Sequence, residues 1–475
     1  MVPDSPLRRL RRLSPLPGLR HLRPLQRRLR RLPLPDRTAL PDTDSLAPPG
    51  VGAWLSRLVA AVLAAGVLAF GFAQGSMTIV LALPELLGAA SVAFLQAEFA
   101  LVNFTVFLLA SGGALAIQLL RRDLPSDPPR TGPDVTAIVP VYRDAAVVDR
   151  SVESLLASEY DDLRVVVVCE PDDEASIDRA RALESRHDRV DCLVNTENPG
   201  SKAAAVNYAA SVTESEHLAV FDADEVVDPA FVPTAVAGLR DADVVQGRTV
   251  PEPDGFVETA AYYESVVLGE LTDRLVSLVT GFRLAASHAI VMRRSAFETA
   301  GGYDPEMLTE DYDFAFRCYE AGLSVREQFA HPSRVTAART PRDWWGQRKR
   351  WLTGYAQVLH RRLGALEASR RSVFALGICA GSVLGNLLIL SMAAKVAVLV
   401  AVDATAWIAA PLAALGVVGI AARWYDARAG HLEGFDLGWA LTPAVLVCYS
   451  LVGIVATVEY VTTWDGEWYS VDKTG

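Results

Sequence analysis

The run HLAVFDADE (residues 217–225) is a short apolar segment that ends in acidic residues. Similar β-rich runs precede it, separated by stretches with helical patterning: VTAIVPVY (135–142), a helix near Ala146–Ala157, LRVVVVCE (163–170), a helix near Ala175–His187, and DCLVN (191–195). Strands that alternate with helices predict a parallel sheet with helices on both faces. This part of the chain is therefore expected to fold as an α/β domain.

The strand ends carry the polar side chains of interest. Ligands of open α/β sheets bind beyond the carboxyl ends of the strands, which puts Tyr142, Glu170 and the acids of FDADE along one rim. Asp222 and Asp224 form a compact pair of hard oxygen ligands, and Mg²⁺ or Mn²⁺ prefers few carboxylates together with phosphate oxygens. A solvated turn at the end of a strand is the alternative explanation for an Asp-x-Asp triplet.

Lys202, in GSKAAAVNYA, is the only Lys in the first 348 residues of a chain with 45 Lys and Arg. It stands at the start of an expected helix, with Asn207 one to two turns on. A Lys retained where Arg is otherwise used indicates a need for a compact charge rather than a guanidinium fork, which suits a diphosphate or a sugar. Chance survival of one surface Lys is the alternative.

Glu310 and Asp311, in MLTEDYDFAFRCYEAG, begin another expected helix, which Thr309 can cap. Acids in the first turn are also favoured by the helix dipole, so a purely structural role would explain them. The alternative is that a carboxylate here is the general base that takes a proton from an attacking hydroxyl group.

Long apolar segments flank the α/β pattern. Segments long enough to cross a bilayer are expected at Ala53–Ala73, Phe99–Leu120, Val373–Val402, Trp407–Ala422 and Leu437–Val461. Val373–Val402 is longer than one span needs and too short for two, so the prediction is five spans, with six as the alternative. Ser76–Glu98, broken by Pro and polar residues, is expected to be interfacial or re-entrant.

Charge sets the expected orientation and excludes one function class. Residues 1–35 hold ten Arg and one Asp, so a chain of net charge −11 carries −20 outside this head. The basic head and the Arg pair after Leu120 favour a cytoplasmic side for both. The acidic remainder would repel a phosphate backbone, which argues against nucleic-acid binding. No CxxC pair or His at metal-ligand spacing indicates a zinc site.

In order along the chain, these segments resemble the membrane-bound family 2 glycosyltransferases, the group that includes cellulose, chitin and hyaluronan synthases. VTAIVPVYRD resembles the first nucleotide-binding strand, SKAAAVN the Lys-x-x-x-x-Asn donor segment and FDADE the metal-binding Asp-x-Asp. TED (309–311) and QRKRW (347–351) resemble the Thr-Glu-Asp and Gln-x-x-Arg-Trp motifs. The resemblance implies an α/β GT-A (nucleotide-diphospho-sugar transferase) domain inserted between transmembrane helices.

The resemblance also implies a role for each matching residue. Asp222 and Asp224 would hold the metal, Mg²⁺ or Mn²⁺, and Asp311, beside Glu310, would be the base of an inverting displacement. The expected donor-binding residues are Pro140, Tyr142, Glu170, Lys202, Asp222 and Arg350, and the expected acceptor-binding residues are Gln347, Trp351 and His288.

Two features narrow these implications. Glu170, in VVCEPDD, stands where the family often has Asp-Asp-Gly-Ser and is expected to contact the nucleoside, with Asp172 or Asp173 as alternatives for that contact. The sequence therefore does not decide whether the donor is a UDP-sugar or a GDP-sugar. The loop RWYDARAGHLEGFD (423–436) holds no Phe-x-Val-Thr gating sequence, so cellulose is not indicated. His288 has a packed or hydrogen-bonded role as its alternative.

QRKRWLTG (347–354) is by composition a membrane-surface anchor, since Trp and basic residues gather at that interface. Arg348 and Lys349 are expected to anchor. Gln347, Arg350 and Trp351, at i, i+3 and i+4, share one helical face, which is expected to look into the sugar site.

The expected protein is a multi-pass cell-membrane enzyme with a cytoplasmic catalytic domain. It would transfer sugar to a polysaccharide or lipid-linked acceptor, processively or one sugar at a time. A non-catalytic nucleotide-binding receptor or transporter is the remote alternative. The expected parts are an Arg/Pro-rich tail (1–50), a first membrane region (51–122), the GT-A domain (123–340), interfacial helices (341–371), a second membrane region (372–462) and a tail (463–475).

Overall fold

The computed structural model describes residues 83–120, 128–364, 369–434 and 436–464, which belong to one compact unit. The Arg-rich tail and the span predicted at Ala53–Ala73 lie outside the described residues. The same holds for residues 465–475.

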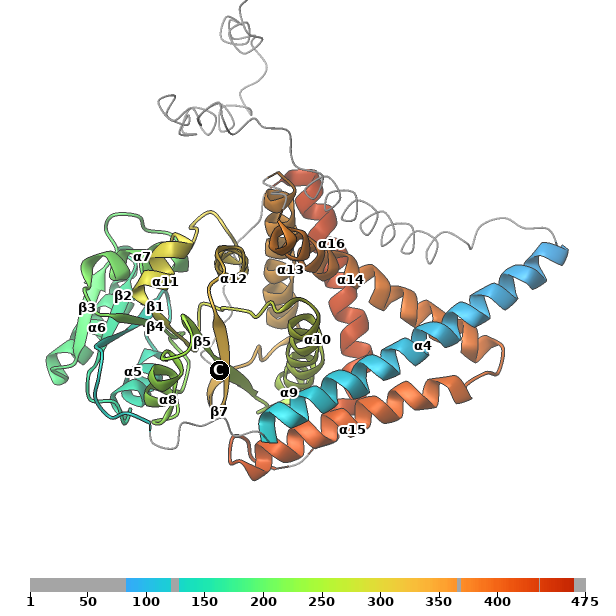
Figure 1. The fold of residues 1–475 in the computed structure, drawn as a ribbon, viewed down its shortest axis with the longest axis horizontal. Helices are drawn as coiled ribbons and strands as arrows, with labels where there is room; N and C mark the ends of the chain where they lie inside the picture. The colour runs from blue at the N-terminus through green and yellow to red at the C-terminus, as the bar shows by residue number, and fades with distance from the viewer. Residues whose placement is uncertain (1–82, 121–127, 365–368, 435, 465–475) are drawn as a thin grey trace, which may run out of the picture. The chain divides into compact units, whose positions relative to one another are not determined.

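One sheet of seven strands forms the centre of the α/β domain within the described residues (Figure 1), in the order β3-β2-β1-β4-β6-β5-β7. Its first four strands along the chain run parallel, β6 runs antiparallel to both β4 and β5, and β7 is parallel to β5. The strands are β1 (Val135–Val141), β2 (Leu163–Cys169), β3 (Val190–Val194), β4 (His217–Val220), β5 (Val244–Glu252), β6 (Ile290–Arg293) and β7 (Val325–Thr336).

The predicted parallel sheet is correct for β1 to β4 and wrong at β6. The first residue of β6, Ile290, pairs with Val220, the last residue of β4. The chain therefore enters β6 from the rim at which β4 ends, and must run in the opposite direction. This reversal brings Ser287 and His288, which lie two to three residues before β6, to the acidic rim.

Helices cover both faces of the sheet, as predicted. In β1, Ala137 and Val139 pack in the core on one face, and Ile138 packs in the core on the other. Strands buried on both faces read as near-continuous apolar runs, which is the pattern of VTAIVPV. The helices α5 (Val148–Leu156), α6 (Glu174–Arg186) and α8 (Phe231–Gly238) contribute to the first core, and α7 (Lys202–Val212), α11 (Arg294–Ala300) and α12 (Glu310–Ala321) to the second.

A helical segment between β5 and β6 connects the domain to the long helices. It consists of α9 (Phe256–Glu264), a π-helical stretch η3 (Ser265–Glu270) and α10 (Leu271–Thr280). Its apolar residues share a core with residues of the long helices, among them Leu108 and Leu415.

Four helices in the described residues are long and apolar enough to cross a membrane, over Val92–Leu120, Arg370–Ala401, Ala406–Arg428 and Gly438–Thr463. They coincide with the four segments predicted as spans in this part of the chain, and their crossing of a membrane stays a prediction. The long helices are α4 (Leu83–Leu120), α14 (Arg370–Ala401), α15 (Ala406–Arg428) and α16 (Thr442–Thr463), with the short η4 (Gly438–Leu441) before α16; the less apolar α13 (Pro341–Gly364) precedes α14.

Two details of the span prediction change. From Leu83 onward, the segment predicted as interfacial or re-entrant, Ser76–Glu98, is part of the continuous helix α4, and its residues 92–98 fall within a helix apolar enough to cross a membrane. Pro84 stands in the first helical turn, where a missing N–H costs no hydrogen bond, so it does not interrupt the helix. The ambiguous stretch Val373–Val402 lies almost wholly in one helix, α14.

Candidate active site

The turn after β4 carries three acids, and the last of them organises it. Glu225 is fully buried. Its carboxylate accepts hydrogen bonds from the backbone N–H groups of Asp222 (2.9 Å) and Ala289 (3.3 Å) and from the Ser333 hydroxyl. Burial raises the pKa of Glu225 to about 7. These contacts tie the Asp-x-Asp turn to the start of β6 and to β7.

Asp222 and Asp224 lie on the same turn with different surroundings. Asp224 is buried and accepts a hydrogen bond from the backbone N–H of Thr336 at 3.3 Å. The Asp222 side chain is one third exposed and pairs with Lys202, Nζ to Oδ1, at 2.5 Å. Within the described residues no group of three His, Cys, Asp or Glu side chains gathers at a metal-binding spacing. Two carboxylates that leave further positions to phosphate oxygens still fit Mg²⁺ or Mn²⁺.

Lys202 is the first residue of α7, as predicted. Ser201 caps this helix, because its side chain accepts a hydrogen bond from the N–H of Ala204. Burial acts to lower the pKa of Lys202, but the charges of Asp222 and Glu310 outweigh it and the pKa is raised. A charged Lys at a helix N-terminus is a favourable place for an anion such as a diphosphate.

Glu310 and Asp311 begin α12, and their surroundings differ. Glu310 is buried and accepts a hydrogen bond from the Ser287 hydroxyl at 2.9 Å; burial, and then the charge of Asp311, raise its pKa. Asp311 is partly exposed, and its Oδ1 accepts from the N–H of Tyr312 at 2.7 Å. Thr309 occupies the N-cap position but its side chain makes no capping bond, so the predicted cap is wrong in that respect.

Helix α13 packs directly on the turn that precedes α12. A Cβ placed on Gly354 would lie 2.5 Å from Oγ1 and Cγ2 of Thr309, so only glycine allows this approach. One turn further on, the Gln357 side chain accepts a hydrogen bond from the N–H of Leu308 at 3.0 Å. This face of α13 is therefore fixed against the Thr-Glu-Asp segment.

Arg350 stands one turn before Gly354 on that face. Burial lowers the pKa of its guanidinium, and the charges of Glu310, Asp311 and Asp222 oppose this lowering. Carboxylates of both acidic segments thus act on Arg350, and its expected role at the donor diphosphate stays a prediction. Gln347 lies one turn earlier on the same helix and is partly buried.

Arg348 does not serve as the predicted surface anchor. Its side chain is 5% exposed and donates from Nε to Glu264 at 2.9 Å. Its guanidinium lies over the Trp351 ring, 4.6 Å from the ring centroid. Lys349 keeps a more exposed position, where it pairs with Glu459 of α16.

The ends of β1 and β2 form the expected donor side of the rim. Pro140 is the penultimate residue of β1, and Tyr142 follows that strand. Glu170 follows β2 and is buried; its carboxylate accepts hydrogen bonds from the N–H of Gly200 at 2.6 Å and from the Asn195 side chain at 3.3 Å. Burial raises the pKa of Glu170, and these two bonds oppose the rise. Glu170 thus shapes the loop before α7.

His288 and Asn207 both hold the protein structure together. The Nδ1 atom of His288 lies 3.2 Å from the Thr249 hydroxyl of β5. The Asn207 amide donates to the carbonyl of Tyr303 at 2.6 Å and its oxygen accepts from the N–H of the same residue at 2.9 Å. Asn207, part of the Lys-x-x-x-x-Asn segment, therefore fastens the loop before α12.

Three residues at the site were missed by the sequence reasoning. Ser287, Glu225 and Glu264 act through hydrogen bonds to residues far away in the chain. Of the three, only Glu225 could have been found from the sequence, because it directly follows Asp224 in FDADE.

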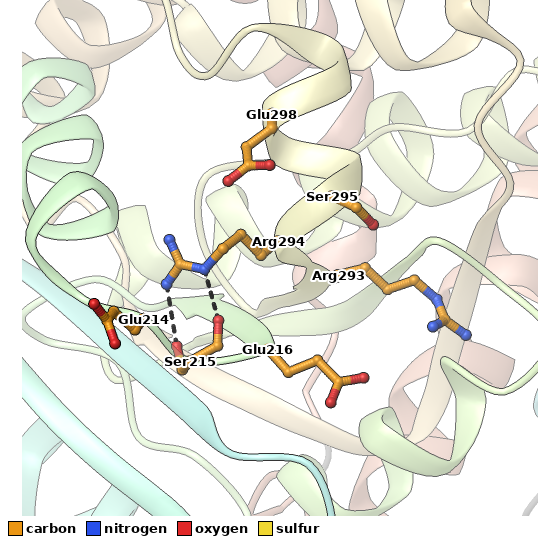
Figure 2. Close-up of a pocket in the computed structure, with 7 residues that line it drawn as sticks. All are labelled: Glu214, Ser215, Glu216, Arg293, Arg294, Ser295 and Glu298. Atoms are coloured by element: carbon orange, nitrogen blue, oxygen red, sulfur yellow. Dashed lines mark hydrogen bonds between the residues drawn. The ribbon is translucent and has the colours of Figure 1, made fainter.

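The hollow in Figure 2 is not the candidate site. It lies at the opposite end of β4, where Arg294 donates to the backbone carbonyls of Ser215 and Ala210, both at 2.6 Å. Arg294 thereby joins the start of α11 to the chain between α7 and β4, which is a structural task.

An acidic turn after β4, a lysine at the start of α7 and a carboxylate pair at the start of α12 meet at one rim of a mixed α/β sheet. The mixed sheet covered by helices on both faces is the fold of GT-A glycosyltransferase domains. Residues 133–355 match the family model described as "Glycosyltransferase like family 2". This segment, a little under half of the chain, is similar to glycosyltransferase family 2 domains.

Curated proteins with similar sequences agree with this family. The probable glycosyltransferase YdaM of Bacillus subtilis (strain 168) is 23% identical over 272 residues, which are 53% of this chain and 62% of YdaM. The cellulose synthase 1 catalytic subunit [UDP-forming] of Komagataeibacter xylinus is 24% identical over 50% of this chain and 32% of that protein. The poly-beta-1,6-N-acetyl-D-glucosamine synthase of Staphylococcus aureus (strain COL) is 18% identical over 48% and 56%. The chain thus spans less than two thirds of each of these relatives.

Among solved structures, the mannosyltransferase PcManGT from Pyrobaculum calidifontis in complex with GDP-Man and Mn²⁺ aligns with a TM-score of 0.47 and 20% identity, over 75% of this chain and 99% of that one. The glucosyl-3-phosphoglycerate synthase from Mycobacterium tuberculosis in complex with UDP aligns with a TM-score of 0.35 and 16% identity, over 48% and 80%.

Proposed function

We propose that this protein is a membrane-integrated, metal-dependent, inverting glycosyltransferase that moves a sugar from a nucleotide-sugar donor to a growing polysaccharide or lipid-linked acceptor. The observation that carries the proposal is the Lys202–Asp222 ion pair at the rim of the sheet, together with the packing of α13, which holds Arg350, on the Thr-Glu-Asp segment that holds Asp311. Two cations and several carboxylates in one partly buried site suit a reaction in which a diphosphate leaves and a hydroxyl loses its proton.

Asp311 is the proposed base. It is the more exposed of the two acids at the start of α12, while Glu310 is buried against Ser287. The acceptor hydroxyl oxygen attacks the anomeric carbon as its proton passes to the Asp311 carboxylate. The bond from that carbon to the diphosphate oxygen breaks, and its electron pair leaves with the nucleoside diphosphate. One such displacement inverts the anomeric configuration.

Charge on the leaving group is neutralised from two sides. Lys202 and Arg350 would face the diphosphate from α7 and α13. Asp222 and Asp224 would hold Mg²⁺ or Mn²⁺, which acts as a Lewis acid on diphosphate oxygens. Glu225 keeps the backbone of the metal-binding turn in place through its bonds to Asp222 and Ala289.

Acceptor binding is assigned to α13, with Trp351 as the platform under the acceptor sugar and Gln347 beside it. His288, at the start of β6, is kept as a candidate acceptor contact. Four apolar helices adjoin the domain, so we place the protein in the cell membrane as a multi-pass protein. The Arg-rich head favours a cytoplasmic catalytic domain.

One experiment identifies the donor and measures the length of the product. The purified full chain is given a panel of UDP- and GDP-sugars with Mg²⁺ or Mn²⁺, and release of nucleoside diphosphate is followed while the product is sized. Turnover of at least one donor, lost when the metal is chelated, is expected. No release from any donor would contradict the proposal.

The size of the product separates the two acceptor classes. A ladder of long chains would mean processive polysaccharide synthesis. A single added sugar on polyprenyl phosphate would mean lipid-linked transfer, which the absence of a Phe-x-Val-Thr sequence in residues 423–436 allows.

A further inference from the structure

Glu264, the last residue of α9, is a buried acid with no role in the reaction described above. Its side chain is 5% exposed. One carboxylate oxygen accepts from the indole N–H of Trp344 at 2.6 Å, and the other accepts from Nε of Arg348 at 2.9 Å. Both donors belong to α13, one turn apart. A buried carboxylate that accepts from two donors on one neighbouring helix fixes both the rotation of that helix about its axis and its position along the axis.

Arg348 contacts both residues expected to bind the acceptor, Trp351 and Gln347, so its own orientation affects theirs. Its guanidinium lies over two indole rings, 5.5 Å from the centroid of Trp344 and 4.6 Å from that of Trp351. It also donates to the side-chain oxygen of Gln347. The planar guanidinium can stack on rings and donate in its own plane at once, which an ammonium group cannot do.

We propose that Glu264 and Arg348 are positioning residues that hold the Trp351 ring and the Gln347 side chain in the orientation that receives the acceptor sugar. The Glu264 carboxylate orients the Arg348 guanidinium, and Arg348 orients the platform. This inference rests on the proposed function in one respect, the role of Trp351 and Gln347 at the acceptor. The new element is that a residue of α9, Glu264, fixes the geometry of the acceptor subsite. Glu264 directly precedes the π-helical stretch η3, and such helical irregularities are often found at functional sites.

The experiment uses the full chain in lipid nanodiscs, labelled with 5-fluorotryptophan. The fluorine signals of Trp351 and Trp344 are assigned with the Trp351→Phe and Trp344→Phe variants. Glu264→Gln removes the charge that orients Arg348, and Arg348→Lys keeps a cation but loses the planar stack. Arg294→Lys is the matched control, because Arg294 makes several hydrogen bonds at the far end of β4 (Figure 2).

Both test variants are expected to shift or broaden the Trp351 signal, and the control is expected to leave it unchanged. In kinetics with a donor that the wild type consumes, cellotetraose and a β-1,6-linked N-acetylglucosamine tetramer serve as acceptor probes. The acceptor KM is expected to rise about tenfold, equivalent to about 1.4 kcal/mol, with donor KM unchanged and kcat at saturating acceptor within about twofold.

An unchanged Trp351 signal in both variants would overturn the inference. So would a fall in kcat with an unchanged acceptor KM, which is the signature of a general structural role. A wild type that consumes no donor would refute the proposed function instead, and the fluorine signals would then decide the inference alone.

Discussion

Replacing Gly354 by Ala is expected to separate the catalytic base from the helix that carries Arg350. The added Cβ would stand 2.5 Å from two side-chain atoms of Thr309, about 1 Å inside an ordinary contact of about 3.5 Å. Overpacking of this kind costs about 1–3 kcal/mol, whereas Ala in place of Gly in a helix gains about 1 kcal/mol. The net change in the free energy of unfolding is therefore small, about 0–2 kcal/mol unfavourable.

The effect on activity should be much larger than the effect on stability. Relief of the clash moves α13 relative to the start of α12 by a fraction of the overlap, and a misplacement of about 1 Å can cost about 100-fold in rate. We expect kcat for Gly354→Ala to fall about 10- to 100-fold. The thermal midpoint should change by only a few degrees, about the shift that 1 kcal/mol causes in a large domain.

A double-mutant cycle tests the cause. Thr309→Ala removes the two atoms at 2.5 Å and leaves the Thr309 Cβ, 2.9 Å from the added one; among the described residues its hydroxyl has no hydrogen-bond partner to lose. The pair Gly354→Ala and Thr309→Ala should therefore recover part of the activity, with a coupling of about 1–3 kcal/mol. Gly364→Ala, on the same helix and with no atom of the described residues within 4 Å of its added Cβ, should leave kcat unchanged. Wild-type kcat in Gly354→Ala, or a coupling near zero, would refute the packing argument.

Further predictions concern the charged groups of the site and one cap. Asp224→Asn should raise the Mn²⁺ concentration needed for half-maximal diphosphate release, and chelation by EDTA should abolish release until Mn²⁺ or Mg²⁺ is restored; full activity in EDTA would contradict the metal assignment. Lys202→Arg should raise the donor KM about tenfold, or about 1.4 kcal/mol, because a planar fork replaces a compact charge; an unchanged donor KM would remove Lys202 from the donor site. Asp173 caps α6, and although burial acts to raise its pKa, its hydrogen bonds lower it. Asp173→Asn keeps a capping oxygen but removes the charge, so it should cost about 0.3–1 kcal/mol of stability above the ordinary Asp pKa of about 3.9. That difference in unfolding midpoint should fade as the pH falls below this value, and a pH-independent difference would count against the pKa argument.

The sequence was sufficient to predict a sheet covered by helices on both faces, but not the direction of every strand in that sheet. Runs such as VTAIVPV and LRVVVVC are apolar throughout because both faces of the sheet are covered, and this is visible in the sequence. A short apolar run reads the same in either direction, so the reversal at β6 could not be seen. That reversal depends on the chain entering β6 from the rim at which β4 ends.

The charged residues at the rim could be predicted, but the residues that orient them could not. Asp222, Lys202 and Asp311 lie at element ends, where a strand or helix pattern stops, and such positions can be read from the sequence. Glu264 lies inside a helical segment and gains its role only when α13 packs on α9. For the same reason Arg348 resembles a surface anchor in sequence, although its side chain is almost fully buried in the fold.

The most direct test of the central claim is the stereochemistry and rate of sugar transfer in the wild type and in Asp311→Asn. Proton NMR of the first product formed from an α-linked nucleotide sugar gives the anomeric configuration of the new bond. The account predicts a β-linked product, and a fall in kcat of about 100- to 10,000-fold in Asp311→Asn with little change in donor KM. An α-linked product, or an Asp311→Asn variant with wild-type kcat, would contradict it.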